Sequence, residues 1–225
     1  MVRKMDKANS LFIIGVAALI VAGAIGVAWV MTYNSSPSQP QASAVQNGPY
    51  QLTLVITTNN YFNSTVGDQP AFFVLENGSL VPSTTITVPS GVEISITIIC
   101  YDNGTAPVPA SMSRVFGTVG NMEQIVNNTM VNMTQASGGL EILSGAQNVS
   151  AVNQNDIAHT FTLFSQSTPI VNIPVPPTSV VHAVIPAMSP GVYQWHCEAA
   201  CGSGPSGWSG AMDTPGWMTG GFIVS

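Results

Sequence analysis

Residues 193–224 read YQWHCEAACGSGPSGWSGAMDTPGWMTGGFIV, and this stretch decides the fold. It begins and ends with short apolar runs typical of strands, which a glycine-rich loop joins. The loop carries Cys197 and Cys201 with three residues between them. His196 stands directly before the pair, and Met218 leads into the last apolar run. Soft sulfur ligands on a loop between two strands are what a copper site needs, so the stretch predicts a copper site.

The rest of the chain beyond residue 49 repeats the alternation of apolar and polar residues that is typical of strands. Glycine and proline separate the alternating runs, as in the turn Pro89-Ser90-Gly91. Several short strands punctuated in this way predict an all-β sandwich. The predicted strands are 50–57, 71–76, 84–88, 92–100, 158–164, 179–185, 192–196 and 220–224.

The segment 102–155 is polar and rich in asparagine, glycine and serine, and we interpret it as an insertion in the sandwich. It contains the one helical candidate, 121–133, in which Met122, Ile125 and Met130 could form an apolar face.

The N-terminus predicts a membrane anchor. Residues 1–10 carry Arg3, Lys4 and Lys7, and residues 11–31 are apolar without a charge, about the length that crosses a bilayer. We predict a transmembrane helix over 11–33, with 1–10 as a cytoplasmic basic tail and everything beyond the helix outside the cell. Residues 34–48 are polar and uncharged, which indicates a flexible linker. The alternative is a cleaved signal peptide, since 42–44 (Ala-Ser-Ala) has the form of a cleavage site.

Charge is scarce in the predicted extracellular part. The only lysine or arginine beyond Lys7 is Arg114, so a basic patch for nucleic acid is excluded. A surface with few basic groups carries little net charge in acid, which limits self-repulsion and suggests an acid-living microbe. Glycosylation is expected as well, because seven Asn-x-Ser/Thr sequons begin at Asn34, Asn63, Asn77, Asn103, Asn127, Asn132 and Asn148.

Three elements recur in an informative order: His159 at the start of a predicted strand, Cys197 at the end of a later one, and Met218 before the last. This order resembles the ligand order of cupredoxins over most of residues 49–225. The resemblance implies a Greek-key β-sandwich that binds copper, with His159, Cys197 and Met218 among the ligands.

The run from Cys197 to Gly202 is CEAACG, which resembles the C-x-x-x-C-G motif of the dicopper CuA domain in cytochrome oxidase subunit II and nitrous oxide reductase. The resemblance implies Cys201 as a ligand, together with a backbone carbonyl at Ala199 or a neighbour. In that family a histidine follows four residues after the second cysteine, where this chain has Pro205. No histidine follows Cys201 anywhere, so the second imidazole of a two-copper centre is missing.

Three models of the site stay open. In the first, one copper lies among His159, Met218 and one or both of Cys197 and Cys201. In the second, an altered two-copper centre forms, with Met212 or His196 in place of the missing histidine. In the third, the two cysteines form a disulfide, which an oxidising exterior favours, and no metal binds.

Other candidate ligands have plainer interpretations. His196 directly precedes Cys197, so on an extended chain its side chain points to the opposite face. His182 stands among valines in a predicted strand and is interpreted as packed or at an edge. Cys100 ends an apolar strand and is interpreted as a buried free thiol.

These features predict a single-pass protein of the cell membrane, facing outward, that carries electrons in a respiratory chain. It is similar in plan to the anchored blue copper proteins of the sulfocyanin kind. The expected partners are the membrane and redox proteins such as a terminal oxidase. Two alternatives stay open: a copper-free, subunit-II-like structural module of a terminal oxidase complex, or a copper chaperone or store.

Overall fold

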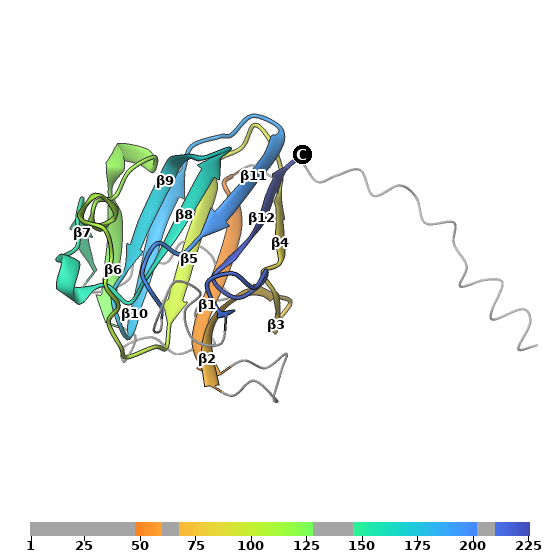
Figure 1. Ribbon diagram of the computed structural model, residues 1–225. Coiled ribbons are helices and arrows are strands. Elements are labelled where there is room, and N and C mark those ends of the chain that lie inside the picture. The colour runs from red at the N-terminus through yellow and green to blue at the C-terminus, as the bar shows by residue number, and fades with distance from the viewer. Residues whose placement is uncertain (1–47, 60–67, 128–145, 202–209) are drawn as a thin grey trace, which may run out of the picture. The chain divides into compact units, whose positions relative to one another are not determined.

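The computed structural model describes residues 48–59, 68–127, 146–201 and 210–225. By its contacts the chain divides into two units, 1–46 and 47–225, and only the second contains described residues. The described residues form two β-sheets, joined by loops and short 3-10 turns, without an α-helix among them (Figure 1).

The larger sheet has seven strands in the order β3-β2-β1-β5-β10-β6-β7. Neighbours are antiparallel except β1 and β5, which run parallel from the pair Tyr50–Ile94 to the pair Ile56–Cys100. Its strands are β1 (Tyr50–Asn59), β2 (Asp68–Glu76), β3 (Ser79–Pro82), β5 (Ile94–Cys100), β6 (Glu123–Asn127), β7 (Gln147–Val149) and β10 (Ser179–Ile185).

The smaller sheet has five strands in the order β4-β12-β11-β8-β9. Again one pair is parallel, β4 with β12, and the others are antiparallel. Its strands are β4 (Thr85–Val88), β8 (His159–Ser165), β9 (Thr168–Val175), β11 (Gly191–His196) and β12 (Thr219–Val224).

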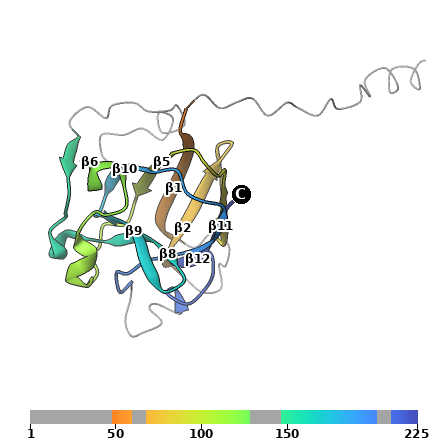
Figure 2. The same cartoon turned by 90° about the horizontal axis from the view of Figure 1, so that it is seen from above.

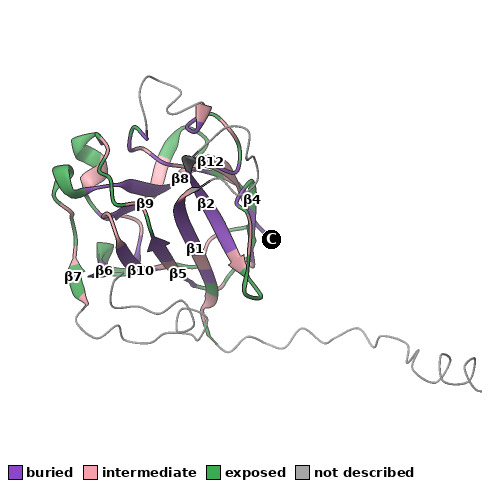
Figure 3. Cartoon of the chain, turned by 90° about the horizontal axis from the view of Figure 1, so that it is seen from below, coloured by how far each residue is buried: buried purple, intermediate pink, exposed green. Residues whose placement is uncertain are grey.

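The two sheets pack face to face, as the view from above shows (Figure 2). One large apolar cluster fills the space between them and takes side chains from both sheets. The strands are mostly buried, whereas the turns and 3-10 segments at the rim are exposed (Figure 3). Burial of apolar surface between two sheets is the main favourable term in the stability of such a fold.

The predicted all-β sandwich is confirmed at this level, and it is consistent with a cupredoxin-like fold. The predicted helix over 121–133 is wrong in its described part, because Glu123–Asn127 is strand β6, which pairs with β10. The segment 102–155 therefore contributes β6 and β7 to the larger sheet. Pairing with a neighbouring strand here overrides a weak local helical pattern.

The predicted tail and anchor, and residues 34–47 of the linker, lie outside the described residues. The described parts of the chain contain no helix that is long and apolar enough to cross a bilayer.

Candidate metal centre

His159 is placed by the alternation of β8. Along this strand His159, Phe161 and Leu163 lie two residues apart, and all three are fully or almost fully buried. Residues two apart on a strand share a face, so His159 is the first inward position of β8 and lies at the end of the core. Phe72 packs edge-on against its ring, with the centroids 6.0 Å apart.

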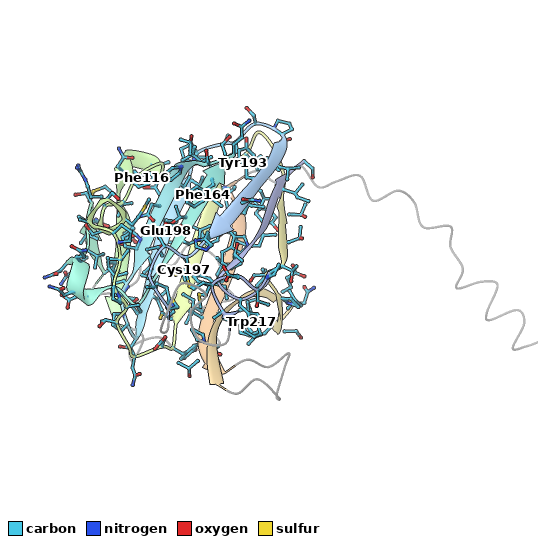
Figure 4. The ribbon with its side chains drawn as sticks, in the orientation of Figure 1. Phe116, Phe164, Tyr193, Cys197, Glu198 and Trp217 are labelled. Carbon is cyan, nitrogen blue, oxygen red and sulfur yellow. The ribbon has the colours of Figure 1, made fainter. Side chains whose placement is uncertain are left out.

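Cys197 is placed by the end of β11. Trp195 is an inward, fully buried position, and Cys197 follows two residues later on the same face. The Cys197 N–H donates to the carbonyl of Met218 at 2.8 Å, which extends the β11–β12 pairing by one step beyond His196 and Thr219. Directly opposed residues share a face of the sheet, and both Cys197 and Met218 are fully buried. Figure 4 labels Cys197 at this end of β11, with Glu198 directly beyond it.

Cys201 returns to the same place because the chain turns tightly after β11. The Cys201 N–H donates to the Ala199 carbonyl at 2.8 Å, and the Ala200 N–H donates to the Pro107 carbonyl at 2.8 Å. The first bond folds the loop back on itself, and the second ties it to the segment after β5. Both cysteines are thereby buried under the loop that carries them.

Three of the four predicted ligands meet at this point. Nδ1 of His159 lies 3.1 Å from Cys201 Sγ and 3.9 Å from Cys197 Sγ, and the two sulfurs are 3.5 Å apart. All three donor atoms lie within 4.8 Å of one another, which suits the coordination of one metal ion. A disulfide bond would bring the sulfurs to about 2.05 Å, so the cysteines are free thiols here and the disulfide alternative is not the state described.

The other ring nitrogen of His159 has a partner that the sequence interpretation did not assign. Nε2 lies 3.0 Å from Asp102 Oδ2, and Asp102 stands two residues beyond the end of β5. The second carboxylate oxygen, Oδ1, accepts the Gly104 N–H at 2.8 Å. Asp102 had one signal in the sequence, its position directly after a long apolar strand.

Opposite charges meet in this group. Burial by itself lowers the pKa of His159, but hydrogen bonds to Asp102 and Cys197 and their charges outweigh it and raise the pKa to about 9. Burial by itself raises the pKa of Asp102, but the hydrogen bonds from His159 and from the Gly104 N–H outweigh burial and lower the pKa. Without metal, His159 therefore favours the protonated form between two anionic partners.

The two cysteines share one negative charge. Burial raises the pKa of Cys197, but hydrogen bonds from Cys201, from His159 and from the Thr160 N–H outweigh it and lower that pKa well below its usual value. The hydrogen bond to Cys197, burial and nearby negative charge raise the pKa of Cys201. Because the sulfurs are only 3.5 Å apart, the first proton leaves the pair easily and the second is held strongly. Both would have to leave if a metal bound both sulfurs.

A cavity of about 300 Å³ reaches the group from outside. Its floor includes the edges of His159 and Cys201, although these residues are only 1% and 3% exposed. Asp102 also lines it, and most of the other lining residues are small or apolar: Pro70, Gly104, Thr105, Ala106, Pro107, Ala158 and Ala200. The metal group thus lies just below a mainly apolar recess.

The remaining histidines and the third cysteine lie outside the group. His196 faces away from Cys197, as predicted: Nδ1 lies 2.7 Å from Glu198 Oε1 and its side chain is 34% exposed. His182 is on β10 with Nδ1 3.3 Å from the Thr97 hydroxyl. Cys100 is buried, as predicted, and forms no disulfide with another described cysteine, and burial raises its pKa to about 12.

One imidazole nitrogen and two thiol sulfurs, with a buried thioether residue beside them, form a donor set that fits copper, the cofactor predicted from the sequence. The described residues supply no second imidazole at this site, because the side chains of His196 and His182 have hydrogen-bond partners elsewhere.

No family model matches the sequence, and no curated protein matches it either. Among solved structures, reduced auracyanin from the photosynthetic bacterium Roseiflexus castenholzii is 15% identical over 79% of this chain and 98% of that one, with a TM-score of 0.32. A multicopper oxidase from Campylobacter jejuni is 10% identical over 81% of this chain and 31% of that one, with a TM-score of 0.36. The McoA multicopper oxidase of Aquifex aeolicus is 12% identical over 80% and 30%, with a TM-score of 0.34.

The chain spans less than half the length of these multicopper oxidases. Because the identities and TM-scores are low, we rest the functional assignment on the residues of the chain itself.

Proposed function

We propose that this protein is a membrane-anchored, outward-facing copper protein that carries electrons in a respiratory chain. The observation that supports it is the buried group of His159 Nδ1, Cys197 Sγ and Cys201 Sγ, with all three atoms within 4.8 Å of one another. Met218, whose backbone bonds to Cys197 and whose side chain is buried, is the fourth candidate ligand.

The donor types favour copper. Thiolate and thioether sulfur with imidazole nitrogen is a soft set that binds Cu(I) well and still accommodates Cu(II). Bound copper would supply one-electron chemistry by alternating between these two states. The single available imidazole favours one copper ion over a two-copper centre.

The protein would contribute rigidity and insulation. His159 and Cys197 stand at the ends of paired strands, and hydrogen bonds from the Thr160 N–H to Cys197 Sγ and from the Cys201 N–H to Ala199 hold the loop in place. A site that is fixed in advance changes little when its charge changes. Burial keeps water from the donor atoms, so the exchange of an electron need not involve the exchange of a ligand.

The apolar recess above His159 and Cys201 is the proposed entry point for electrons. Ala200 is exposed at its rim, and Pro107 is exposed across from it on the segment after β5. Apart from His159 and Cys201 of the metal group, Asp102 is the only residue lining the recess whose side chain can be charged. An apolar rim would allow a redox partner to dock in acid, where surface carboxylates lose their charge.

The anchor and the respiratory role rest on the sequence alone. A helix over 11–33 would confine the copper domain to the membrane surface, and the linker would let it reach a partner there. A membrane-bound terminal oxidase is the class of partner that fits this arrangement.

Metal analysis and spectroscopy of the full chain, purified in mild detergent and reduced before loading, test the proposal. We expect one copper per chain, an intense thiolate-to-copper band in the visible spectrum and a reversible one-electron couple in voltammetry. A preference for zinc over copper, or a colourless protein with a bond between Cys197 and Cys201 detected by mass spectrometry, would overturn it. Tight Cu(I) binding without a reversible couple would instead indicate a copper store.

A further inference from the structure

Asp102 connects the two sheets at the metal group. It lies where the chain leaves β5 of the seven-stranded sheet, and it contacts His159, which opens β8 of the five-stranded sheet. The contact joins Oδ2 to Nε2 at 3.0 Å, with the His159 side chain 2% and the Asp102 side chain 15% exposed. The remaining nitrogen, Nδ1, faces the two sulfurs.

Hydrogen bonds also hold the carboxylate and the backbone of Asp102 in place. Its other oxygen accepts the Gly104 N–H at 2.8 Å. The backbone carbonyl of Asp102 accepts the Thr178 N–H at 2.8 Å, and Cys100 Sγ lies 3.6 Å from the same carbonyl. Because both carboxylate oxygens and the carbonyl are engaged, the position of Oδ2 is fixed before any metal binds.

We infer that Asp102 is a positioning residue for the metal ligand His159, an inference that rests on the proposed function. By accepting a hydrogen bond from Nε2, the carboxylate keeps one proton on that nitrogen and leaves the Nδ1 lone pair directed at the site. The same hydrogen bond also fixes the orientation of the imidazole ring. A ligand histidine bonded to a carboxylate in this way is held in one tautomer and one orientation.

The charge of Asp102 has a second effect. A carboxylate behind an imidazole makes the ring a stronger donor, and the stronger donor stabilises the more highly charged metal state. Asp102 should therefore favour Cu(II) over Cu(I) and lower the reduction potential of the site. A carboxylate that served only to stabilise the fold would have no such effect, and a buried ion pair adds little net stability by itself.

The test compares Asp102→Asn with the wild type, both as copper-loaded full chains. Asparagine keeps an oxygen that can accept from Nε2 but removes the charge. We expect Cu(II) affinity to fall by about 10–100-fold, the usual effect of losing an outer partner of a ligand, while the thiolate-to-copper band remains. If Cu(I) affinity is unchanged, each tenfold loss raises the one-electron potential by about 59 mV.

Asp156→Asn is the matched control, because Asp156 is an exposed carboxylate just before β8 whose backbone N–H bonds to Asn153. It removes the same charge from a position three residues before His159 and should leave both the potential and Cu(II) affinity at wild-type values. An equal shift in both variants would mean that net charge, and not contact with His159, sets the potential.

The inference and the proposed function fail differently. If the wild type lacks the thiolate-to-copper band, the proposed function is wrong, and so is the role of Asp102. If the wild type shows the band but Asp102→Asn has an unchanged potential and Cu(II) affinity, only the inference about Asp102 is wrong. Should the variant not fold, nitrogen NMR of the wild-type Cu(I) form decides instead. We expect metal on Nδ1 and a slowly exchanging Nε2–H, and metal on Nε2 would overturn the inference.

Discussion

Asp102 and Glu123 are both carboxylates withdrawn from solvent, Asp102 partly and Glu123 almost completely, and the fold treats them in opposite ways. Asp102, beside the metal group, bonds through both oxygens to His159 and to the Gly104 N–H. Glu123, the first residue of β6, is 1% exposed, and neither of its oxygens has a hydrogen-bond partner among the described residues. The pKa of Asp102 is lowered, while burial raises the pKa of Glu123 well above its usual value.

The comparison shows that hydrogen-bond partners can outweigh burial in deciding which form of a carboxylate the fold prefers. A buried carboxylate with an imidazolium and an N–H around it is stabilised as the anion, whereas one among apolar groups is stabilised as the acid. On β6, Glu123 shares its face with Ile125, which packs on the main core. The fold thus favours the ionised form of Asp102 and the protonated form of Glu123.

Removal of the partner of Asp102 should have the largest effect. His159→Gln takes away a proposed metal ligand and leaves the Asp102 carboxylate with only backbone bonds. Loss of an outer partner of a ligand costs up to about 100-fold in affinity, and we expect loss of the ligand itself to cost more copper affinity than that. The visible band should disappear. Competition with a copper chelator measures the affinity.

His182→Gln is the matched control for this substitution. His182 is a half-buried strand histidine whose Nδ1 meets the Thr97 hydroxyl on the larger sheet, away from the sulfurs. The control should keep both copper and colour. If His159→Gln still bound copper with the wild-type spectrum, the imidazole of His159 would not be a ligand.

Glu123→Gln should have the next largest effect, on stability alone. Because the pKa of Glu123 is raised, the folded chain keeps a proton that the unfolded chain loses above pH 4.5 or so, near the usual glutamate value. The contribution of Glu123 to the stability of the fold is therefore largest in acid and falls as the pH rises towards its raised pKa. Glutamine resembles the protonated acid and does not titrate, so at neutral pH the variant should be more stable by about 1–3 kcal/mol.

Denaturant unfolding of the metal-free chain in acid and at neutral pH measures this effect. Glu93→Gln, at an exposed position, is the control and should follow the wild type at both pH values. If the stability difference between acid and neutral pH were the same in Glu123→Gln as in the wild type, the carboxyl of Glu123 would have a hydrogen-bond partner in solution.

The strands and the metal donors were predictable because both follow from alternation. The prediction for 179–185 matches β10 residue for residue, since its β-branched residues fill both faces of a strand between two neighbours. The same alternation carries His159 and Cys197 to the inner face. The return of Cys201 was predictable only from its resemblance to a known motif.

The strand β9 was not among the predicted strands, and its sequence contains Pro169 and Pro174. Proline is tolerated here because β9 is the edge strand of the smaller sheet. Asn172 donates its N–H to Phe116 and not to β8, and Pro174, two residues later, faces the same outer side, so Pro174 removes no ladder bond to β8.

Asp102 was missed for a different reason. It lies 57 residues before His159 in the sequence, and only the packing of one sheet on the other brings the two together. Alternation predicts which face of a strand a residue occupies, but not which residue of the opposite sheet it meets. That step depends on the register of both sheets and on the path of the loop after β5.

The smallest effect is expected at His196, whose partner Glu198 is only partly buried. The hydrogen bond to Glu198 raises the pKa of His196 against the opposing effect of burial. The pairing therefore stabilises the fold below the usual histidine pKa, about 6.5, and the stabilisation is lost as pH rises through the raised value. His196→Gln should cost at most about 1 kcal/mol near pH 5.5, less at high salt and nothing near pH 9, as measured by denaturant unfolding.

The same variant separates two models of the metal site. If one copper is held by His159 and the sulfurs, His196→Gln should leave the visible band, the copper count and the potential unchanged, because His196 faces away from Cys197. A loss of one of two coppers, or a change in the band, would mean that His196 turns inward on metal binding. The two-copper centre would then replace the one-copper site, with His196 as the imidazole that the C-terminal loop lacks.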